Sequence, residues 1–278
     1  MRRATLLVFA VTSAALFAVV SARGAPEDAA DTKKLFDDGV HALQLERPNE
    51  AVASFEALAD RGVVDAVASY DRGLAYALRV RMAAEQPGDL GRAAHGFEEA
   101  RTLSSDPRLV SDAEAALATV RAEVGRRKAR EGVRVDVEQR SSLWRSLSHS
   151  LGENAWAAIA LASALALGVG LFIRWLAEGS RARAGAAIAI VAAAPTLVLA
   201  AALARTARHD RLYLREAVVV STSARPSDSH GIVLPQATPL PEAARVEIVE
   251  QNGGWTEFRW GALEAWVPTA TLRPLAKP

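Results

Sequence analysis

The chain has 278 residues; half of them are hydrophobic but only 6% are aromatic, and the formal net charge is +1. The near-neutral charge argues against a nucleic-acid-binding protein, which would present a strongly basic field. The sequence contains no cysteine, which excludes disulfides, thiolate metal sites and cysteine nucleophiles.

The N-terminus has the pattern of an export signal. Met1-Arg2-Arg3 is a positive start, an apolar run follows to Val20, and small residues precede Pro26. This pattern predicts a secretory signal peptide over residues 1–24, with an uncleaved anchor helix as the alternative. In both cases we expect the residues that follow to be exported.

Residues 27–130 are charged, rich in alanine and helical in period, and parts of them repeat. The string "FDDGV" is answered by "YDRGL", which puts Gly39 and Gly73 34 positions apart. The string "EAVASFEAL" is answered by "RAAHGFEEA", which aligns Phe55 with Phe97. A glycine in the first helix of each unit allows the second helix to approach closely, and alanine four residues before phenylalanine shares its helix face.

This period resembles the tetratricopeptide repeat, which implies paired helices stacked around a shared core. The run over 107–130 is expected to be the closing helix. Phe36 and Tyr70 occupy a first-helix position that can face the concave groove, so they are candidate protein-binding residues; packing in the core is the alternative. The adjacent carboxylates Glu98 and Glu99 and the basic run 125–130 are predicted to be solvated.

Two long runs without charge follow, at 155–173 and 184–204. At 1.5 Å per residue they extend about 29 and 32 Å as helices, enough to cross the hydrocarbon core of a bilayer. Neither run contains an ionisable residue, so we expect anchors rather than a proton or ion path. The segments 131–154 and 205–216 are expected to be linkers.

The orientation follows from the number of spans. After an exported start, the first span returns to the cytoplasm and the second leaves it, so the loop 174–183 is predicted to be cytoplasmic. Arginines flank both ends of the spans, so the positive-inside rule alone does not decide. We therefore expect a protein of the bacterial inner membrane with both large parts in the periplasm.

Residues 217–275 alternate in short strands separated by turn signals. The pattern resembles the bacterial SH3-like domain, carried here by Val246-Glu247-Ile248, Gly253-Gly254-Trp255 and Ala265-Trp266-Val267. The resemblance implies a small all-β barrel. Three tryptophans are a candidate aromatic binding surface, although a small barrel also needs large side chains in its core; they are Trp255, Trp260 and Trp266.

No motif for catalysis stands out. The five histidines are scattered, and no zinc-protease helix, nucleophile elbow, Walker loop or dinucleotide-binding loop is present. We therefore predict a protein that is not an enzyme, with no catalytic residue, no metal and no cofactor.

The order of parts, from signal peptide through repeats and two spans to an SH3-like domain, resembles the BatE-type proteins of the aerotolerance operon. That resemblance implies a periplasmic scaffold in envelope-stress tolerance. It also implies two partner classes, membrane proteins with von Willebrand A domains and a MoxR-type AAA ATPase. The alternative is a cell-wall tether that binds peptidoglycan through the SH3-like domain. We expect the lipid bilayer to be a partner, and we expect no nucleic acid to bind.

Overall fold

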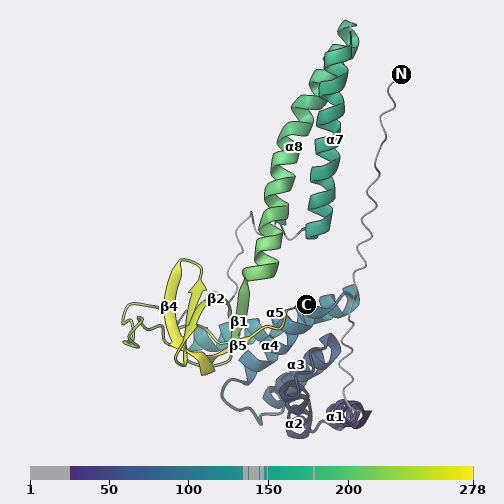
Figure 1. Cartoon of the computed structure of the whole chain (residues 1–278). Helices are drawn as coiled ribbons and strands as arrows, with labels where there is room; N and C mark the ends of the chain where they lie inside the picture. The colour runs from purple at the N-terminus through teal and green to yellow at the C-terminus, as the bar shows by residue number, and fades with distance from the viewer. Residues whose placement is uncertain are drawn as a thin grey trace, which may run out of the picture.

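The computed structural model describes residues 26–277 except 134–136, 138–143, 145–146, 149 and 178. The predicted signal peptide lies outside the described residues, as does much of the predicted linker 131–154. The described part is mostly helical, with a long helical hairpin that projects from a body of shorter helices and one small sheet (Figure 1).

Five helices, which we call the helical unit, open the described chain: α1 (Pro26–Gln44), α2 (Pro48–Asp60), α3 (Ala66–Arg81), α4 (Asp89–Leu103) and α5 (Pro107–Arg130). Their starts follow from local chemistry. The Asp65 carboxylate accepts hydrogen bonds from the first backbone amides of α3, and Asp106 does the same for α5. Pro48 and Pro107 occupy the first turns of α2 and α5, where a missing amide costs nothing.

The internal repeat is visible in the packing of these helices. Gly39 of α1 lies against the ring of Phe55, and a Cβ there would come within 2.8 Å of that ring. Gly73 of α3 lies against Phe97 in the same way, also at 2.8 Å. The close approach predicted for each glycine is confirmed, and the two helix pairs α1–α2 and α3–α4 repeat one contact.

Helices α7 (Glu153–Leu176) and α8 (Ser180–Tyr213) are long and apolar enough to cross a membrane. They run side by side in opposite directions, and residues 177–179 connect them (Figure 1). Many large apolar side chains point outward, including Leu161, Phe172 and Val191 at 64%, 60% and 73% exposure. A surface of that kind is stable in lipid rather than in water.

Small residues bring the two long helices together. The residues they bury are spaced by seven positions, which is the spacing of a coiled-coil seam; they are Ser163 and Gly170 of α7 and Ala186, Ala193 and Ala200 of α8, together with Leu203. Small side chains at such a seam let two helices pack closely without a hydrophobic driving force.

The sheet contains β1 (Arg215–Val219), β2 (Arg245–Asn252), β3 (Trp255–Trp260), β4 (Leu263–Pro268) and β5 (Leu272–Pro274), with the short helix η1 (Thr269–Thr271) before β5. The strands are antiparallel in the order β4-β3-β2-β1-β5. Gly253 and Gly254 have positive φ and form the tight turn between β2 and β3.

The predicted barrel is not closed. Over the residues that the structure describes, β4 and β5 are the two edges of an open sheet and do not pair with each other. Strand β5 has only three residues, and the chain after it continues over the helical unit rather than toward β4. The loop at Ser227 covers the β4 edge instead, where its backbone amide and carbonyl each bond Trp266 at 2.8 Å.

The junction between α8 and the sheet also differs from the expected linker over 205–216. Helix α8 continues to Tyr213, and only Leu214 separates it from β1. The nine helical residues 205–213 beyond the predicted span extend the helix by roughly 13 Å at 1.5 Å per residue. The sheet is therefore attached to a candidate membrane-spanning helix with the single residue Leu214 between them.

Candidate interaction surfaces

The two aromatic residues predicted to line a groove occupy equivalent places in the helical unit. Phe36 packs edge-on against Phe55, with ring centroids 6.1 Å apart. Tyr70 packs at a tilt against Phe97, with centroids 5.5 Å apart. Both residues are half-buried, so each ring contributes to the core while part of it stays accessible. The structure does not bring the two residues into contact with each other.

The three tryptophans predicted as one aromatic surface divide between the two faces of the sheet. Trp260 shares a face with Phe258 and packs against the core of the sheet. Trp255 is opposite Pro268, and Trp266 is opposite Glu257, so these two rings are diagonal neighbours on the other face. Both are half-buried. The outer face of β3 and β4 therefore carries two of the three tryptophans, and the third is a core residue.

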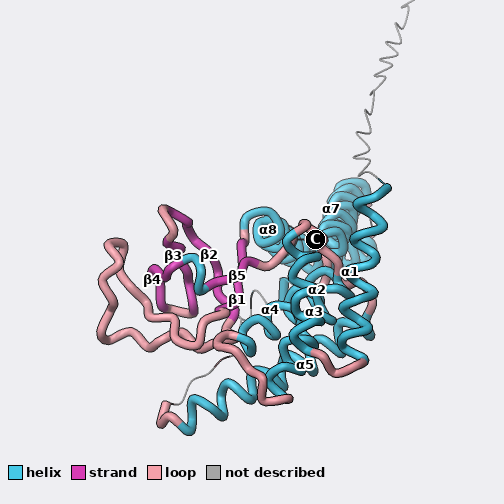
Figure 2. Tube along the Cα trace, turned by 90° about the horizontal axis from the view of Figure 1, so that it is seen from below, coloured by secondary structure: helices cyan, strands magenta, loops and turns pink. Residues whose placement is uncertain are grey.

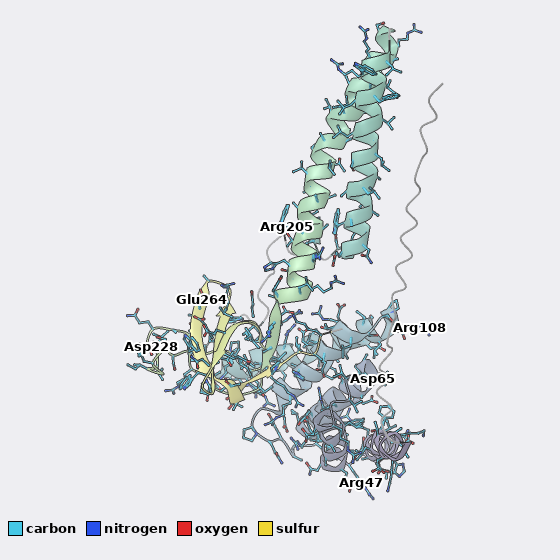
Figure 3. All side chains as sticks on the ribbon, in the orientation of Figure 1. Arg47, Asp65, Arg108, Arg205, Asp228 and Glu264 are labelled. Atoms are coloured by element: carbon cyan, nitrogen blue, oxygen red, sulfur yellow. The ribbon has the colours of Figure 1, made fainter. Side chains whose placement is uncertain are left out.

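A loop covers part of this outer face. The ring of Trp255 lies against Gly231, where a Cβ would come within 3.1 Å of the indole. Asp228 holds the loop tip, because its carboxylate accepts from the amides of His230 and Ile232 at 2.9 Å. These bonds lower the pKa of Asp228 below its usual range. Figure 3 shows Asp228 at the outer tip of this loop and Glu264 on the nearby strand β4.

The largest surface that the sequence did not reveal is the contact between the helical unit and the sheet. The first turn of α4 packs directly on the backbone after β1, where a Cβ on Gly91 would come within 2.5 Å of the Val219 carbonyl oxygen. The amide of Gly91 donates to the Glu242 carboxylate at 2.7 Å. A carboxylate at a helix N-terminus is favourable, because the free amides there carry partial positive charge.

Glu98 is the most enclosed charge of this contact, with 1% of the residue exposed. Its carboxylate accepts hydrogen bonds from Arg101 at 2.7 Å, Arg121 at 2.6 Å and Arg245 at 3.3 Å. Burial alone would raise the pKa of Glu98, but the charges of Arg245, Arg101 and Arg121 outweigh it and hold the pKa below its usual range. Because Arg245 comes from β2, this carboxylate joins the sheet to the helical unit.

Arg245 is itself held from the sheet side. Its guanidinium makes two hydrogen bonds to Glu216 of β1, one of them at 2.9 Å. The pair Glu98 and Glu216 thus shares one arginine between two elements. Bidentate arginine–carboxylate geometry fixes orientation as well as distance.

Glu99 and Glu56 make a second group of buried polar contacts beside the first. Glu99 accepts from Arg72 at 2.6 Å and from the Ser69 hydroxyl at 2.7 Å. Glu56 accepts two hydrogen bonds from Arg273, both at 2.8 Å, and one from the Tyr76 hydroxyl at 2.8 Å. Arg273 belongs to β5, so this group also ties the sheet to the helices.

The prediction that Glu98 and Glu99 are solvated was wrong, because their helix face turns toward a domain that lies far along the chain. The prediction that the basic run 125–130 is solvated is confirmed for Arg126 and Arg130, whose side chains are 62% and 71% exposed, although Arg126 also pairs with Glu123 at 2.8 Å. One local signal existed for the buried network. Arg72 stands where the repeat pattern has a leucine, and a charge at a core position requires a buried partner.

The contact between the two parts also fixes how they lie relative to the hairpin. Residues before α7 and after α8 leave the hairpin at the same end, and the helical unit and the sheet pack together there (Figures 1 and 2). If the hairpin crosses a membrane, both parts lie on the same side of it. This conclusion does not depend on counting charges or on the signal peptide.

The part of the chain that the structure describes contains no group of three or more histidine, aspartate or glutamate side chains arranged to hold a metal ion. In the comparisons with known proteins, no family model, no curated protein sequence and no solved structure matches this chain. Function must therefore be argued from the residues and their geometry.

Proposed function

We propose that this protein is a scaffold anchored in the bacterial inner membrane, which binds protein partners through its extramembrane body. The observation that carries this proposal is the joining of helical unit and sheet into one body at one end of the apolar hairpin. Helices α1 to α3 lie farthest from the hairpin, with Asp65 and Arg47 at their exposed ends (Figure 3). A partner can reach them without contacting lipid.

The body faces the periplasm in this proposal. The signal-like N-terminus and the even number of spans after it support that side. Residues 177–179 at the far end of the hairpin are too few to form a domain, whichever side they occupy. The protein then has one interacting side.

The partner classes come from the resemblance to BatE-type proteins of the aerotolerance operon. Tetratricopeptide-like repeats and an SH3-like sheet on a membrane anchor suit a protein that gathers others, here A-domain membrane proteins and a MoxR-type ATPase. The repeated Gly39–Phe55 and Gly73–Phe97 contacts support the repeat identity. The paired strands around Gly253 support the SH3-like one, in an open rather than closed form.

The test is affinity capture of the tagged full-length protein from its native membrane in mild detergent, read by quantitative mass spectrometry. We expect A-domain proteins or the ATPase to be enriched with the wild type and lost with Tyr70→Ala. Tyr70→Phe is the matched control, because it keeps the ring that packs on Phe97. Equal recovery of all partners with both variants would remove Tyr70 from the binding surface, and no enriched partner would refute the scaffold.

A second function is favoured by one observation, the shared outer face of Trp255 and Trp266. Half-buried aromatic rings that are neighbours on one face can stack on sugar rings or peptides, so the part of this face that the loop leaves open could hold peptidoglycan. Co-sedimentation with purified sacculi tests this. We then expect the Trp255→Ala/Trp266→Ala double variant to stay in the supernatant, while Glu264→Ala, exposed on the same strand, sediments like the wild type.

A further inference from the structure

The residues Arg273–Lys277, which we call the C-terminal segment, begin in β5 and continue past the end of the sheet over the helical unit. Figures 1 and 2 both place the C-terminal end over the helices rather than over the sheet. Leu275 still bonds β1, since its amide donates to the Glu216 carbonyl at 2.8 Å. Its side chain, however, packs against the apolar core of the helical unit. Along this segment, hydrogen bonds to the sheet therefore give way to contacts with the helical unit.

Two side chains of α4 bind the backbone of this segment. His95 bonds the Pro274 carbonyl oxygen through Nε2 at 2.9 Å, and Glu99 accepts from the amide of Ala276 at 3.2 Å. His95 and Glu99 are four positions apart on one helix, so they lie on the same face. Pro274 and Ala276 are two positions apart, so an extended backbone presents both groups to that face. Contacts of this kind recognise an extended chain whatever its side chains.

Side-chain contacts add selectivity. The Arg273 guanidinium makes a two-fold contact with Glu56, and Leu275 two positions later makes the apolar contact. At the far end, Lys277 donates to the carbonyl oxygens of Arg211 and Leu212, at 3.5 and 3.1 Å, near the C-terminal end of α8. A cation is favourable there, because the last carbonyls of a helix carry partial negative charge.

The groups that hold the segment are positioned by other residues of the helical unit. Tyr76 bonds Glu56, Ser69 and Arg72 bond Glu99, and Arg72 also lies 3.3 Å from Nδ1 of His95. Burial lowers the pKa of His95 to about 4, so at neutral pH its ring is neutral and Nε2 carries the proton that Pro274 accepts. The site is therefore pre-organised without help from its occupant.

We propose that Glu56, His95 and Glu99 form a peptide-binding site and that the C-terminal segment is its internal, replaceable ligand. The external ligand is an extended protein segment with arginine or lysine at one position and an apolar residue two positions later. This inference rests on the scaffold function proposed above and names the chemistry of its partner. In the resting protein the site is occupied, so partner binding requires the segment to leave.

The experiment uses the purified full-length protein in detergent and a fluorescein-labelled peptide with the sequence TLRPLAK, measured by fluorescence anisotropy. The released variant carries Arg273→Glu, which places a like charge beside Glu56, and Leu275→Asp, which replaces the apolar contact with a charge. We expect the released variant to bind the peptide saturably and at least about tenfold more tightly than the wild type, because the site of the wild type is occupied. A tenfold change in affinity is about what the loss of one close charge pair causes. A peptide with glutamate in place of arginine should not bind.

Three results would overturn the proposal. One is a folded released variant that binds the peptide no better than its charge-reversed form. Another is binding that survives when Glu56→Arg is added. If the released variant does not fold, Arg273→Ala replaces it, and absence of peptide binding by that variant decides against the site. This experiment contains no partner protein, so its result is independent of the affinity capture. Either experiment can fail while the other succeeds.

Discussion

Arg72 shows what a single unexpected residue can indicate. Its side chain is 6% exposed and pairs with Glu99 at 2.6 Å, at a position where the tetratricopeptide pattern that the sequence resembles has a leucine. A buried charge needs a close partner of opposite charge, and Arg72 has two, Glu99 and, at 3.9 Å, Glu56. The arginine therefore marks the face on which the last strand and the C-terminal segment pack.

Replacing Glu98 with glutamine should strongly destabilise the extramembrane body. The variant keeps the size of the side chain but leaves Arg101, Arg121 and Arg245 without the carboxylate they share. Removing one partner of a buried pair costs roughly 3–5 kcal/mol. Denaturant unfolding of the protein in detergent, followed by tryptophan fluorescence, measures this loss.

Glu114→Gln is the matched control for that measurement. Glu114 lies 3.8 Å from the same Arg101, but its side chain is 57% exposed. Surface pairs contribute about 0–1 kcal/mol. An equal loss in both variants would mean that the burial of Glu98 is not what makes it important.

His95 should make stability depend on pH in a defined window. Its pKa is about 4 in the folded protein, against an ordinary value of 6.5. Between these values the unfolded chain binds a proton at His95 and the folded chain does not, so its contribution to stability falls as pH is lowered from 6.5 toward 4. Above pH 6.5 the contribution is complete.

The measurement compares wild type with His95→Gln, which can still donate to the Pro274 carbonyl. Asp71, whose pKa is raised to about 6 by burial and by the charge of Asp65, acts in the opposite direction within this window. It is present in both proteins and cancels in the comparison. We expect a smaller loss of unfolding free energy between pH 7 and pH 5 in the variant, and identical losses would contradict the assignment.

At the scale of elements, glycines set how closely the helices approach. A Cβ on Gly96 of α4 would come within 2.6 Å of the Ser69 carbonyl oxygen and 2.7 Å of the Gly73 amide nitrogen in α3. Because both are backbone atoms, neither can rotate away. We expect Gly96→Ala to lower stability by about 1–3 kcal/mol, the usual cost of overpacking.

Gly125 of α5 provides the opposite case, because nothing lies within 4 Å of a Cβ built there. In an open helical position, alanine is favoured over glycine by about 0.5–1 kcal/mol. Thermal unfolding of the two variants side by side should therefore move in opposite directions. Destabilisation by Gly125→Ala would show that backbone freedom is needed in α5.

The elements differ in how far the sequence could predict them. The helices, the close helix approach at Gly39 and Gly73 and the two long apolar helices follow from periodicity within a few tens of residues, and the structure agrees. Whether the sheet closes into a barrel could not be predicted from local periodicity. It depends on whether the last strand pairs with β4 or turns toward the helices, where Arg273 binds Glu56 of α2, 217 positions earlier in the chain.

The candidate surfaces were predicted less well than the elements. Alternation along β3 correctly placed Phe258 and Trp260 on one face, but it could not separate a ligand-facing tryptophan from one in the core. The buried network was missed because its partners are far apart in the chain: Glu98 and Arg245 are separated by 147 positions, and Glu99 and Ala276 by 177. A pattern within a short stretch of sequence cannot indicate that two residues so far apart are in contact.

At the scale of the whole molecule, the packing of helical unit and sheet predicts the result of a labelling experiment. The chain has no cysteine, so single cysteines can be placed at three exposed positions, Ser105, Arg181 and Ser229. With a membrane-impermeant maleimide and a permeabilised outer membrane, we expect Ser105→Cys and Ser229→Cys to react. Arg181→Cys, at the far end of the hairpin, should react only after the inner membrane is breached.

The pattern of labelling separates two claims. Opposite accessibility of Ser105→Cys and Ser229→Cys would contradict the packing of the two parts on one side. Labelling of both only after the breach would leave that packing intact and would refute the periplasmic orientation.

The packing of first-made helices against last-made strands has a consequence for synthesis. Ribosomes produce the helical unit early, yet the arginine that completes the Glu98 group follows 147 positions later, beyond both long helices. In the proposed topology, the Glu98 carboxylate lacks Arg245 until the hairpin is inserted and the chain end has crossed the membrane. We therefore expect the extramembrane body to complete its packing only after insertion, so that a copy whose hairpin has not inserted exposes a charged surface that a finished copy buries.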